Sequence, residues 1–200
     1  RAGSKGLRGK NFLKIGKKIL ITYTLEKAKK SNLFDQITVS TDSKKIKNIK
    51  KNNKKIFFFK RPKYLASDKA SKLDAIRHAL ILSEKKYNKK FDIIVDLDVT
   101  SPLRNIKDIK TAMKIFKKTK SDNLFSVNES RKNPYFNMVE IDNKKVRLVK
   151  KYKKNLNRRQ DAPITYDMNA SIYIWKRSII LGSNNLFRKK TSIYIMPHER

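Results

Sequence analysis

Strand-like and helix-like segments alternate along the first two thirds of this chain, and this pattern constrains the fold more than any other feature. Four short runs of β-branched or aromatic residues fit buried strands, at residues 37–39, 56–59, 93–95 and 124–127. Apolar residues recur at helical spacing from about Lys18 to Lys30, after the candidate N-cap Ser71, and from Ile106 to Phe116. Such alternation predicts an α/β fold with a mostly parallel sheet and flanking helices.

The alternation stops near Asn128. Residues 136–150 fit a hairpin with its turn at 142–144, and a basic, polar stretch continues to Pro163. Strand-like runs then return at 170–175 and 193–196. We therefore predict an α/β domain made of residues 1–127 and 164–200, with residues 128–163 inserted as a small β-rich lobe.

Ligands of open parallel sheets bind beyond the carboxyl ends of the strands. Polar residues follow the predicted strands at these ends, namely Ser40, Thr41, Asp42, Asp96, Asp98, Thr100 and Ser101. Asp98 is the leading metal candidate, because a carboxylate there can hold Mg²⁺ on a bound nucleotide. The alternative is that Asp98 caps backbone groups of Ser101 or Arg104 in the turn that follows it, and the residues alone leave both roles open.

The first eleven residues favour phosphate binding, since they contain three glycines, one serine and four basic residues. Glycine lets successive backbone N–H groups curl around an anion, and basic side chains add full positive charge. Arg1, Lys5 and Lys10 are candidate triphosphate contacts, although any single lysine can equally be a solvated surface residue. Arg61, next to Pro62, is placed to reach a phosphate or a ligand carboxylate, or to form a structural salt bridge.

The formal net charge of +34 raises the possibility of a nucleic-acid-binding protein. Against it, the lysines are scattered along every segment rather than gathered in one stripe. Lysine, asparagine and isoleucine are abundant together, as codon bias would produce. The chain has no cysteine, no apolar run of membrane-spanning length and no recognisable signal peptide. We expect a cytoplasmic protein without a membrane partner.

Five blocks, in order and at matching spacing, resemble the cytidylyltransferases that activate sialic acids, at residues 1–6 with 10–11, 39–42, 61–68, 100–104 and 169–174. The resemblance covers essentially the whole chain. It implies a Rossmann-like α/β fold with a small dimerisation lobe, and a homodimer. It also implies a reaction of CTP with a nine-carbon 2-keto sugar acid, with Mg²⁺ as cofactor, that gives CMP-sugar and pyrophosphate for glycan biosynthesis.

The resemblance also implies roles for single residues. The triphosphate contacts would come from the loop that contains Arg1, Ser4, Lys5, Gly6 and Lys10. Asn11 would contact cytidine, while Arg61 and Ser71 would lie along the nucleotide. The sugar pocket would contain Asp98, Arg159, Asn169 and Tyr173. Among these, Arg1, Lys10 and Asp98 would act in catalysis, with Asp98 on the metal.

Three positions depart from the usual pattern of the sialic acid enzymes. Asp98 stands where many have glutamine, Lys72 where serine is frequent, and Asp167 where a basic residue is frequent. An aspartate accepts hydrogen bonds only, whereas glutamine also donates, so sugar selection or metal binding should differ. These departures favour the bacterial branch that acts on legionaminic acid or a related diamino sugar. An enzyme for an eight-carbon keto sugar acid and a nucleic-acid-binding protein remain the alternatives.

The resemblance further leads us to expect one central strand ahead of Arg1 and further metal-binding aspartates after Arg200. We accordingly expect the 200-residue sequence by itself to lack full activity.

Overall fold

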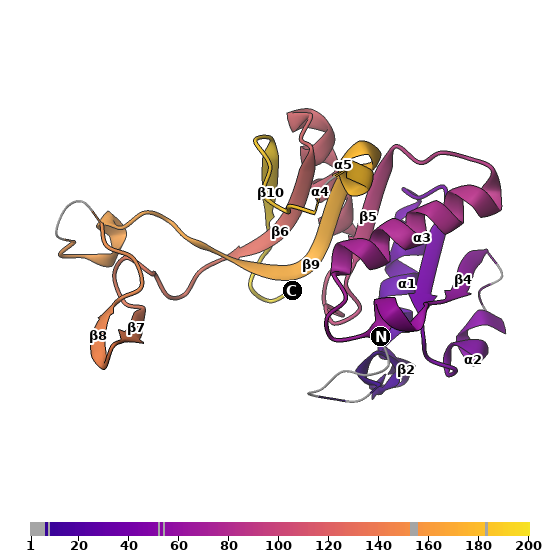
Figure 1. The fold of residues 1–200 in the computed structure, drawn as a ribbon, viewed down its shortest axis with the longest axis horizontal. Helices are drawn as coiled ribbons and strands as arrows, with labels where there is room; N and C mark the ends of the chain where they lie inside the picture. The colour runs from indigo at the N-terminus through magenta and orange to yellow at the C-terminus, as the bar shows by residue number, and fades with distance from the viewer. Residues whose placement is uncertain (1–6, 8, 52, 54, 153–155, 183) are drawn as a thin grey trace.

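The computed structural model describes residues 7, 9–51, 53, 55–152, 156–182 and 184–200. Its largest sheet has the strand order β10-β6-β9-β5. The bounds are β5 Ile93–Leu97, β6 Asn123–Glu129, β9 Tyr166–Lys176 and β10 Thr191–Ile195. β9 runs antiparallel to β5 and β6, and β10 runs parallel to β6, so β5, β6 and β10 all point the same way (Figure 1). The predicted mostly parallel sheet is confirmed, with β9 as the reversed strand.

A second, parallel pair is formed by β3 (Ile37–Thr41) and β4 (Ile56–Lys60). The short helix α2 (Ile46–Lys51) connects them, as parallel strands require a crossover. After β4 the chain turns at Arg61 into the 3₁₀ helix η2 (Lys63–Ala66). This pair lies at the opposite end of the body from β10 (Figure 1).

Three longer helices flank the strands: α1 Leu20–Ser31, α3 Lys72–Tyr87 and α4 Ile106–Thr119. The first helix begins about two residues later than predicted. Lys18–Ile19 forms the strand β2 instead, which pairs with β1 (Lys14–Ile15) as a small hairpin. The short helix α5 (Arg177–Gly182), which follows β9, was not anticipated from the sequence.

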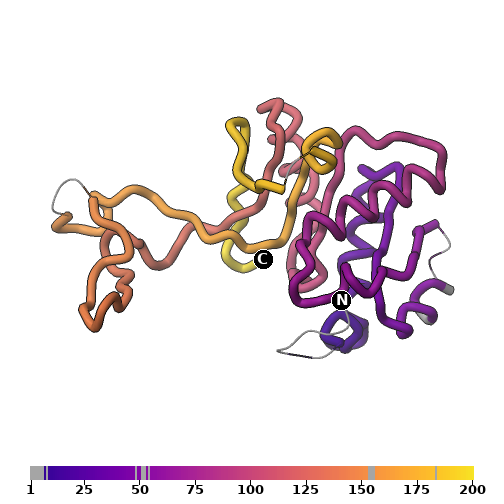
Figure 2. Tube along the Cα trace, viewed as in Figure 1, coloured from indigo at the N-terminus to yellow at the C-terminus, as the bar shows by residue number. Residues whose placement is uncertain are grey.

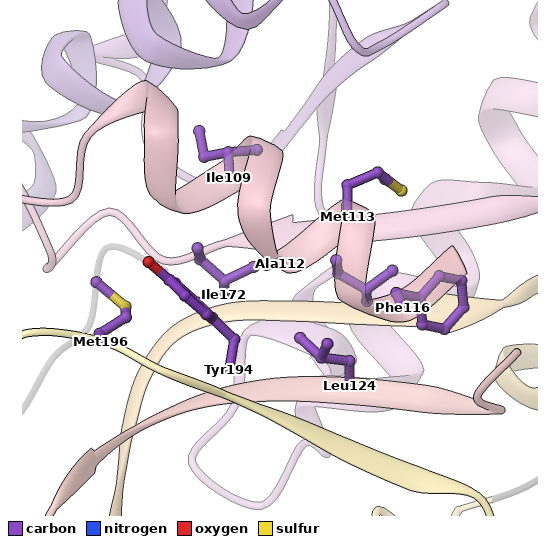
Figure 3. Packing of buried hydrophobic residues seen from close by; sticks show 9 residues of the cluster. Ile109, Ala112, Met113, Phe116, Leu124, Ile172, Tyr194 and Met196 are labelled. Carbon is purple, nitrogen blue, oxygen red and sulfur yellow. The ribbon is translucent and has the colours of Figure 1, made fainter. Parts of the chain in front are cut away.

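The four-stranded sheet is buried on both faces. On one face it meets α4, whose Ile109, Met113 and Phe116 pack in one cluster with Ile172 and Ile174 of β9 (Figure 3). The other face packs against α3 and α5, through Leu80, Phe125, Tyr173, Trp175 and Ile180. Successive residues of β9 alternate between the two clusters, as the pleat of a strand requires. Helices on both faces are what a mostly parallel sheet needs to bury its apolar strands.

Residues 128–163, here called the arm, project from the body, to which the strands β6 and β9 connect them (Figures 1 and 2). The arm ends in the hairpin of β7 (Val139–Asp142) and β8 (Lys145–Leu148). Asn143 and Lys144 have φ of 49° and 63°, as a two-residue type I′ turn demands. The predicted hairpin is therefore confirmed. The 3₁₀ helix η3 (Arg159–Asp161) lies near the return to β9.

Candidate functional site

The carboxyl end of β5 delivers two carboxylates, Asp96 and Asp98, to the edge where a ligand is expected. Asp98 Oδ1 accepts hydrogen bonds from the backbone N–H of Thr100 at 2.8 Å and from its hydroxyl at 2.6 Å. Asp98 thus does cap a backbone group of the following turn, that of Thr100 rather than of Ser101 or Arg104, and this cap uses only one carboxylate oxygen. Asp98 Oδ2 faces the ammonium of Lys72 at 3.7 Å.

Arg104 holds this turn from inside the protein. Its side chain is fully buried and donates to the carbonyl of Ser171 at 2.6 Å and to the carbonyl of Asp98 at 3.1 Å. It also donates to the Thr24 hydroxyl of α1 at 3.1 Å. One guanidinium thereby joins the turn after β5 to the middle of β9 and to the helix α1. Sequence analysis identified Arg104 only as the last residue of the block at 100–104, because no neighbouring residue indicates that its side chain points into the interior.

Lys72 contacts site residues that sequence analysis had identified separately. Its Nζ lies 2.7 Å from Asp96 Oδ2 and 4.4 Å from the centre of the Tyr173 ring. Asp96 and Tyr173 face each other directly across the β5–β9 ladder. Two predicted residues, Asp98 and Tyr173, therefore share one cluster with Lys72, which sequence analysis had recorded only as a departure.

The electrostatics of this cluster favour its charged forms. Burial raises the pKa of Asp98, but the two hydrogen bonds from Thr100 and the charges of Lys72 and Lys10 outweigh it, and the pKa is lowered. Burial likewise lowers the pKa of Lys72, yet the attraction of Asp96 and Asp98 prevails and raises it. Asp98 is ionised and Lys72 protonated at neutral pH.

The described part of the candidate phosphate loop begins at Leu7. Lys10 and Asn11 lie in the 3₁₀ helix η1 (Lys10–Phe12), which follows Gly9 at φ 66°, a left-handed conformation that suits glycine. Asn11 Oδ1 is buried without a hydrogen-bond partner in the described protein, so it is an acceptor available to a ligand. The predicted contacts Arg1, Ser4, Lys5 and Gly6 lie outside the described residues.

Two further predicted nucleotide contacts have structural partners. Arg61 Nε donates to the Ser40 hydroxyl at 3.0 Å and Arg61 Nη2 to the Ser40 carbonyl at 3.0 Å, which ties the ends of β4 and β3 together. Ser71 is the N-cap of α3 and its hydroxyl accepts from the N–H of Leu73 at 3.2 Å. Their roles toward a nucleotide remain predictions.

Asn169 is held by a network within the protein. Its Oδ1 accepts from the Ser126 hydroxyl at 2.6 Å and from the N–H of Ser171 at 3.1 Å, and its Nδ2 donates to Asn128 Oδ1 at 2.9 Å. The network spans an irregularity in the β6–β9 register, where Ala170 has a φ of 56°. Such a bulge re-aims neighbouring side chains and is frequent beside functional sites.

Arg159, the remaining predicted sugar contact, belongs to η3 in the arm. Its described partner is the carbonyl of Ser130 at the base of the arm, at 3.1 Å. Ser130 also donates to Asp167 at 2.7 Å, so the third departure from the usual pattern anchors the arm to β9. Arg159 therefore lies in the arm and is not part of the Lys72 cluster.

The donor set at the end of β5 suits a hard cation such as Mg²⁺. Among the described residues no group of three His, Cys, Asp or Glu side chains is placed to hold a metal. Mg²⁺ on a nucleotide, however, is commonly bound by one or two carboxylates together with phosphate oxygens. Asp98 offers one such carboxylate, whereas Asp96 is already paired with Lys72 at 2.7 Å.

A sequence model of the family described as cytidylyltransferase matches residues 1–198. The chain belongs to the cytidylyltransferase family. It is 43% identical over 196 residues to the CMP-N,N′-diacetyllegionaminic acid synthase of Campylobacter jejuni, covering 98% of this chain and 83% of that protein. It is 33% identical to the N-acylneuraminate cytidylyltransferase of Streptococcus agalactiae, covering 100% of this chain and 47% of that protein. The predicted family and the nucleotidyltransferase activity are confirmed.

Solved structures agree on the fold of this cytidylyltransferase. The CMP:2-keto-3-deoxy-manno-octonic acid synthetase complexed with CTP superposes with a TM-score of 0.61 at 17% identity, covering 90% of this chain and 72% of that one. The expected Rossmann-like α/β fold is thereby confirmed. No described helix of this chain has the length and apolar character that crossing a membrane would require.

Proposed function

We propose that this cytidylyltransferase transfers CMP from CTP to a nine-carbon 2-keto sugar acid of the legionaminic type, with release of pyrophosphate. The observation that carries the proposal is the cluster of Asp98, Lys72 and Tyr173 at the strand ends. Two of the three positions that depart from the sialic acid pattern, Lys72 and Asp98, lie there beside Tyr173, a predicted sugar-pocket residue. The greater identity to the legionaminic acid synthase than to the N-acylneuraminate enzyme supports the same branch.

In the proposed reaction the anomeric hydroxyl oxygen of the sugar attacks the α-phosphorus of CTP. The bond between that phosphorus and the bridging oxygen breaks, pyrophosphate leaves with the electron pair, and the hydroxyl loses its proton. Bound Mg²⁺ would supply positive charge against the departing pyrophosphate. Asp98 would hold the ion, and Lys10 would add positive charge from the candidate phosphate loop. The buried Asn11 Oδ1 is suited to accept a hydrogen bond from the cytosine amino group.

Positioning of the two substrates supplies most of the catalysis in this proposal. Arg104 holds the Asp98 turn, and the Asn169 network holds the adjacent bulge of β9. Hydrogen bonds inside the protein hold both groups in place, through Nη1 and Nη2 of Arg104 and through both side-chain amide atoms of Asn169. The strand-end carboxylates therefore need little reorganisation when the nucleotide enters.

We further propose that the arm mediates a homodimer. The hairpin exposes Val139, Ile141 and Val146 at 63%, 77% and 68%, and Met138 and Leu148 are partly exposed, at 40% and 38%. An apolar surface of this kind on a projecting hairpin is suited to pack against a second copy. Analytical ultracentrifugation of the full-length protein and of Ile141→Asp tests this role. We expect a dimer for the wild type and monomers for the variant, and a monomeric wild type would refute it.

Pyrophosphate release by the full-length protein tests the activity. CTP and Mg²⁺ are combined in turn with legionaminic acid, N-acetylneuraminic acid and an eight-carbon keto sugar acid. We expect release with the first acid above the other two. Preference for N-acetylneuraminic acid would retain the family and reject the branch. No release with any acid, together with salt-sensitive binding of RNA or DNA, would reject the enzyme and support the nucleic-acid alternative.

We place the reaction in the cytoplasm, with neither a nucleic acid nor a membrane as partner.

A further inference from the structure

Lys72 occupies a position that helix electrostatics disfavour. It is the first residue of α3, directly after the N-cap Ser71. The N-terminus of a helix carries partial positive charge, so acidic side chains are stabilised there and a lysine is not. The other members of the cluster must offset this cost.

The surroundings of the ammonium supply that compensation. Asp96 Oδ2 lies 2.7 Å from Nζ, Asp98 Oδ2 lies 3.7 Å away, and the face of Tyr173 lies at 4.4 Å. The carboxylate side chains are only 25% and 28% exposed, so solvent screens them poorly. Removing the ammonium would leave two neighbouring negative charges at the strand ends.

A nucleoside triphosphate is itself highly negative. The same strand ends must accept the triphosphate. Without Mg²⁺, two uncompensated carboxylates there would repel it. With Lys72 present, the formal charge of the cluster falls from −2 to −1, because Asp96 and Asp98 contribute −2 and Lys72 contributes +1. A lysine at this position therefore reduces the repulsion of an incoming triphosphate, which a purely structural helix cap would not do.

We propose that Lys72 is a positioning residue that neutralises Asp96, orients Asp98 and so permits CTP to bind at the strand ends. This inference rests on the proposed function, since it requires CTP as the ligand. Lys72 acts through the two carboxylates and through Tyr173, not by bonding to the reacting atoms.

Calorimetric titration of the full-length protein with CTP and Mg²⁺ tests the proposal without any sugar. For an assumed separation of about 10 Å between the ammonium and the phosphates and an effective dielectric near 20, loss of this unit charge should weaken CTP binding about tenfold in Lys72→Met. Lys72→Arg keeps the charge and should bind nearly as the wild type does. The double variant Lys72→Met with Asp96→Asn restores the charge of the cluster and should recover most of the affinity.

Lys176→Met is the matched control. Lys176 pairs with Asp122 at 3.1 Å with similar exposure, 41% and 24%, but it lies at the other end of the β5–β9 ladder. Its loss should change CTP affinity less than about twofold, since screened charges far apart interact weakly. Thermal unfolding of every variant separates lost binding from lost folding.

The outcomes distinguish the two proposals. If the wild type does not bind CTP, the proposed function fails. If the wild type binds CTP and folded Lys72→Met binds equally well, the role of Lys72 is refuted and the function stands. If Lys72→Met is weakened and the double variant is weakened further, the ammonium is not acting through charge and the proposal is also overturned.

Discussion

Replacing Arg104 with methionine should destabilise the protein and loosen the Asp98 turn. The guanidinium makes four hydrogen bonds in the interior, to the carbonyl and hydroxyl of Ser171, the hydroxyl of Thr24 and the carbonyl of Asp98. Burial lowers its pKa to about 10, so the group is still charged at neutral pH. Methionine fills much of the same space without donating any of these bonds.

The expected cost follows from the bonds lost and the partners that remain. A hydrogen bond to a charged group contributes about 1.5–3 kcal/mol. Two acceptors keep a second donor, because the carbonyl of Ser171 also accepts from the N–H of Asp98 at 3.1 Å, and the carbonyl of Asp98 accepts from Thr24 at 3.4 Å. Removing a buried cation also recovers part of its desolvation cost. The net loss should therefore be about 3 kcal/mol rather than the sum of four bonds.

Thermal unfolding of the full-length protein measures this loss. For a domain of this size about 3 kcal/mol corresponds to a fall in Tm of roughly 6–12 °C. Arg147→Met is the control, because Arg147 pairs with Glu140 and Asp142 on the exposed hairpin, where ion pairs contribute at most about 1 kcal/mol. A Tm for Arg104→Met within about 2 °C of the wild type would refute the stabilising role of the Arg104 hydrogen bonds. An equal loss of Tm in the control would refute it as well.

Substitutions at three further positions test the backbone strain at Ala170 and the pH dependence of stability. Ala170→Val should lower the free energy of unfolding in urea by at least about 1 kcal/mol, because a β-branched residue at φ 56° is strained, whereas Ala170→Gly should be tolerated. Burial and the hydrogen bond to Asp108 raise the pKa of Tyr194 to about 12 from 10.0, so this stabilisation is complete below pH 10 and disappears by about pH 12. In Tyr194→Phe the alkaline decline should be shallower, and an identical decline would contradict the assignment. Hydrogen bonds from Arg177 lower the pKa of Glu84, whose stabilisation is present above its ordinary value and lost as the pH falls, so Glu84→Gln should flatten the acid limb of stability against pH.

Local sequence patterns predicted the regular elements well. The apolar runs at 37–39, 56–59 and 93–95 became β3, β4 and β5, and the hairpin turn at Asn143 was recognised from its residues. These features depend on the propensities of adjacent residues and on short-range hydrogen bonding, both of which are readable along the chain. The ordered motifs also indicated the family.

Which distant residues meet was decided by the tertiary structure alone. Lys72, Asp98 and Tyr173 lie far apart in the sequence. Only the antiparallel pairing of β9 with β5 brings Tyr173 next to Lys72 at the carboxyl end of β5. Burial of Arg104 likewise requires β5, β9 and α1 to converge. Local propensity sets elements, but the partners of a buried charge depend on the three-dimensional path of the chain, because desolvation and pairing are properties of the packed interior.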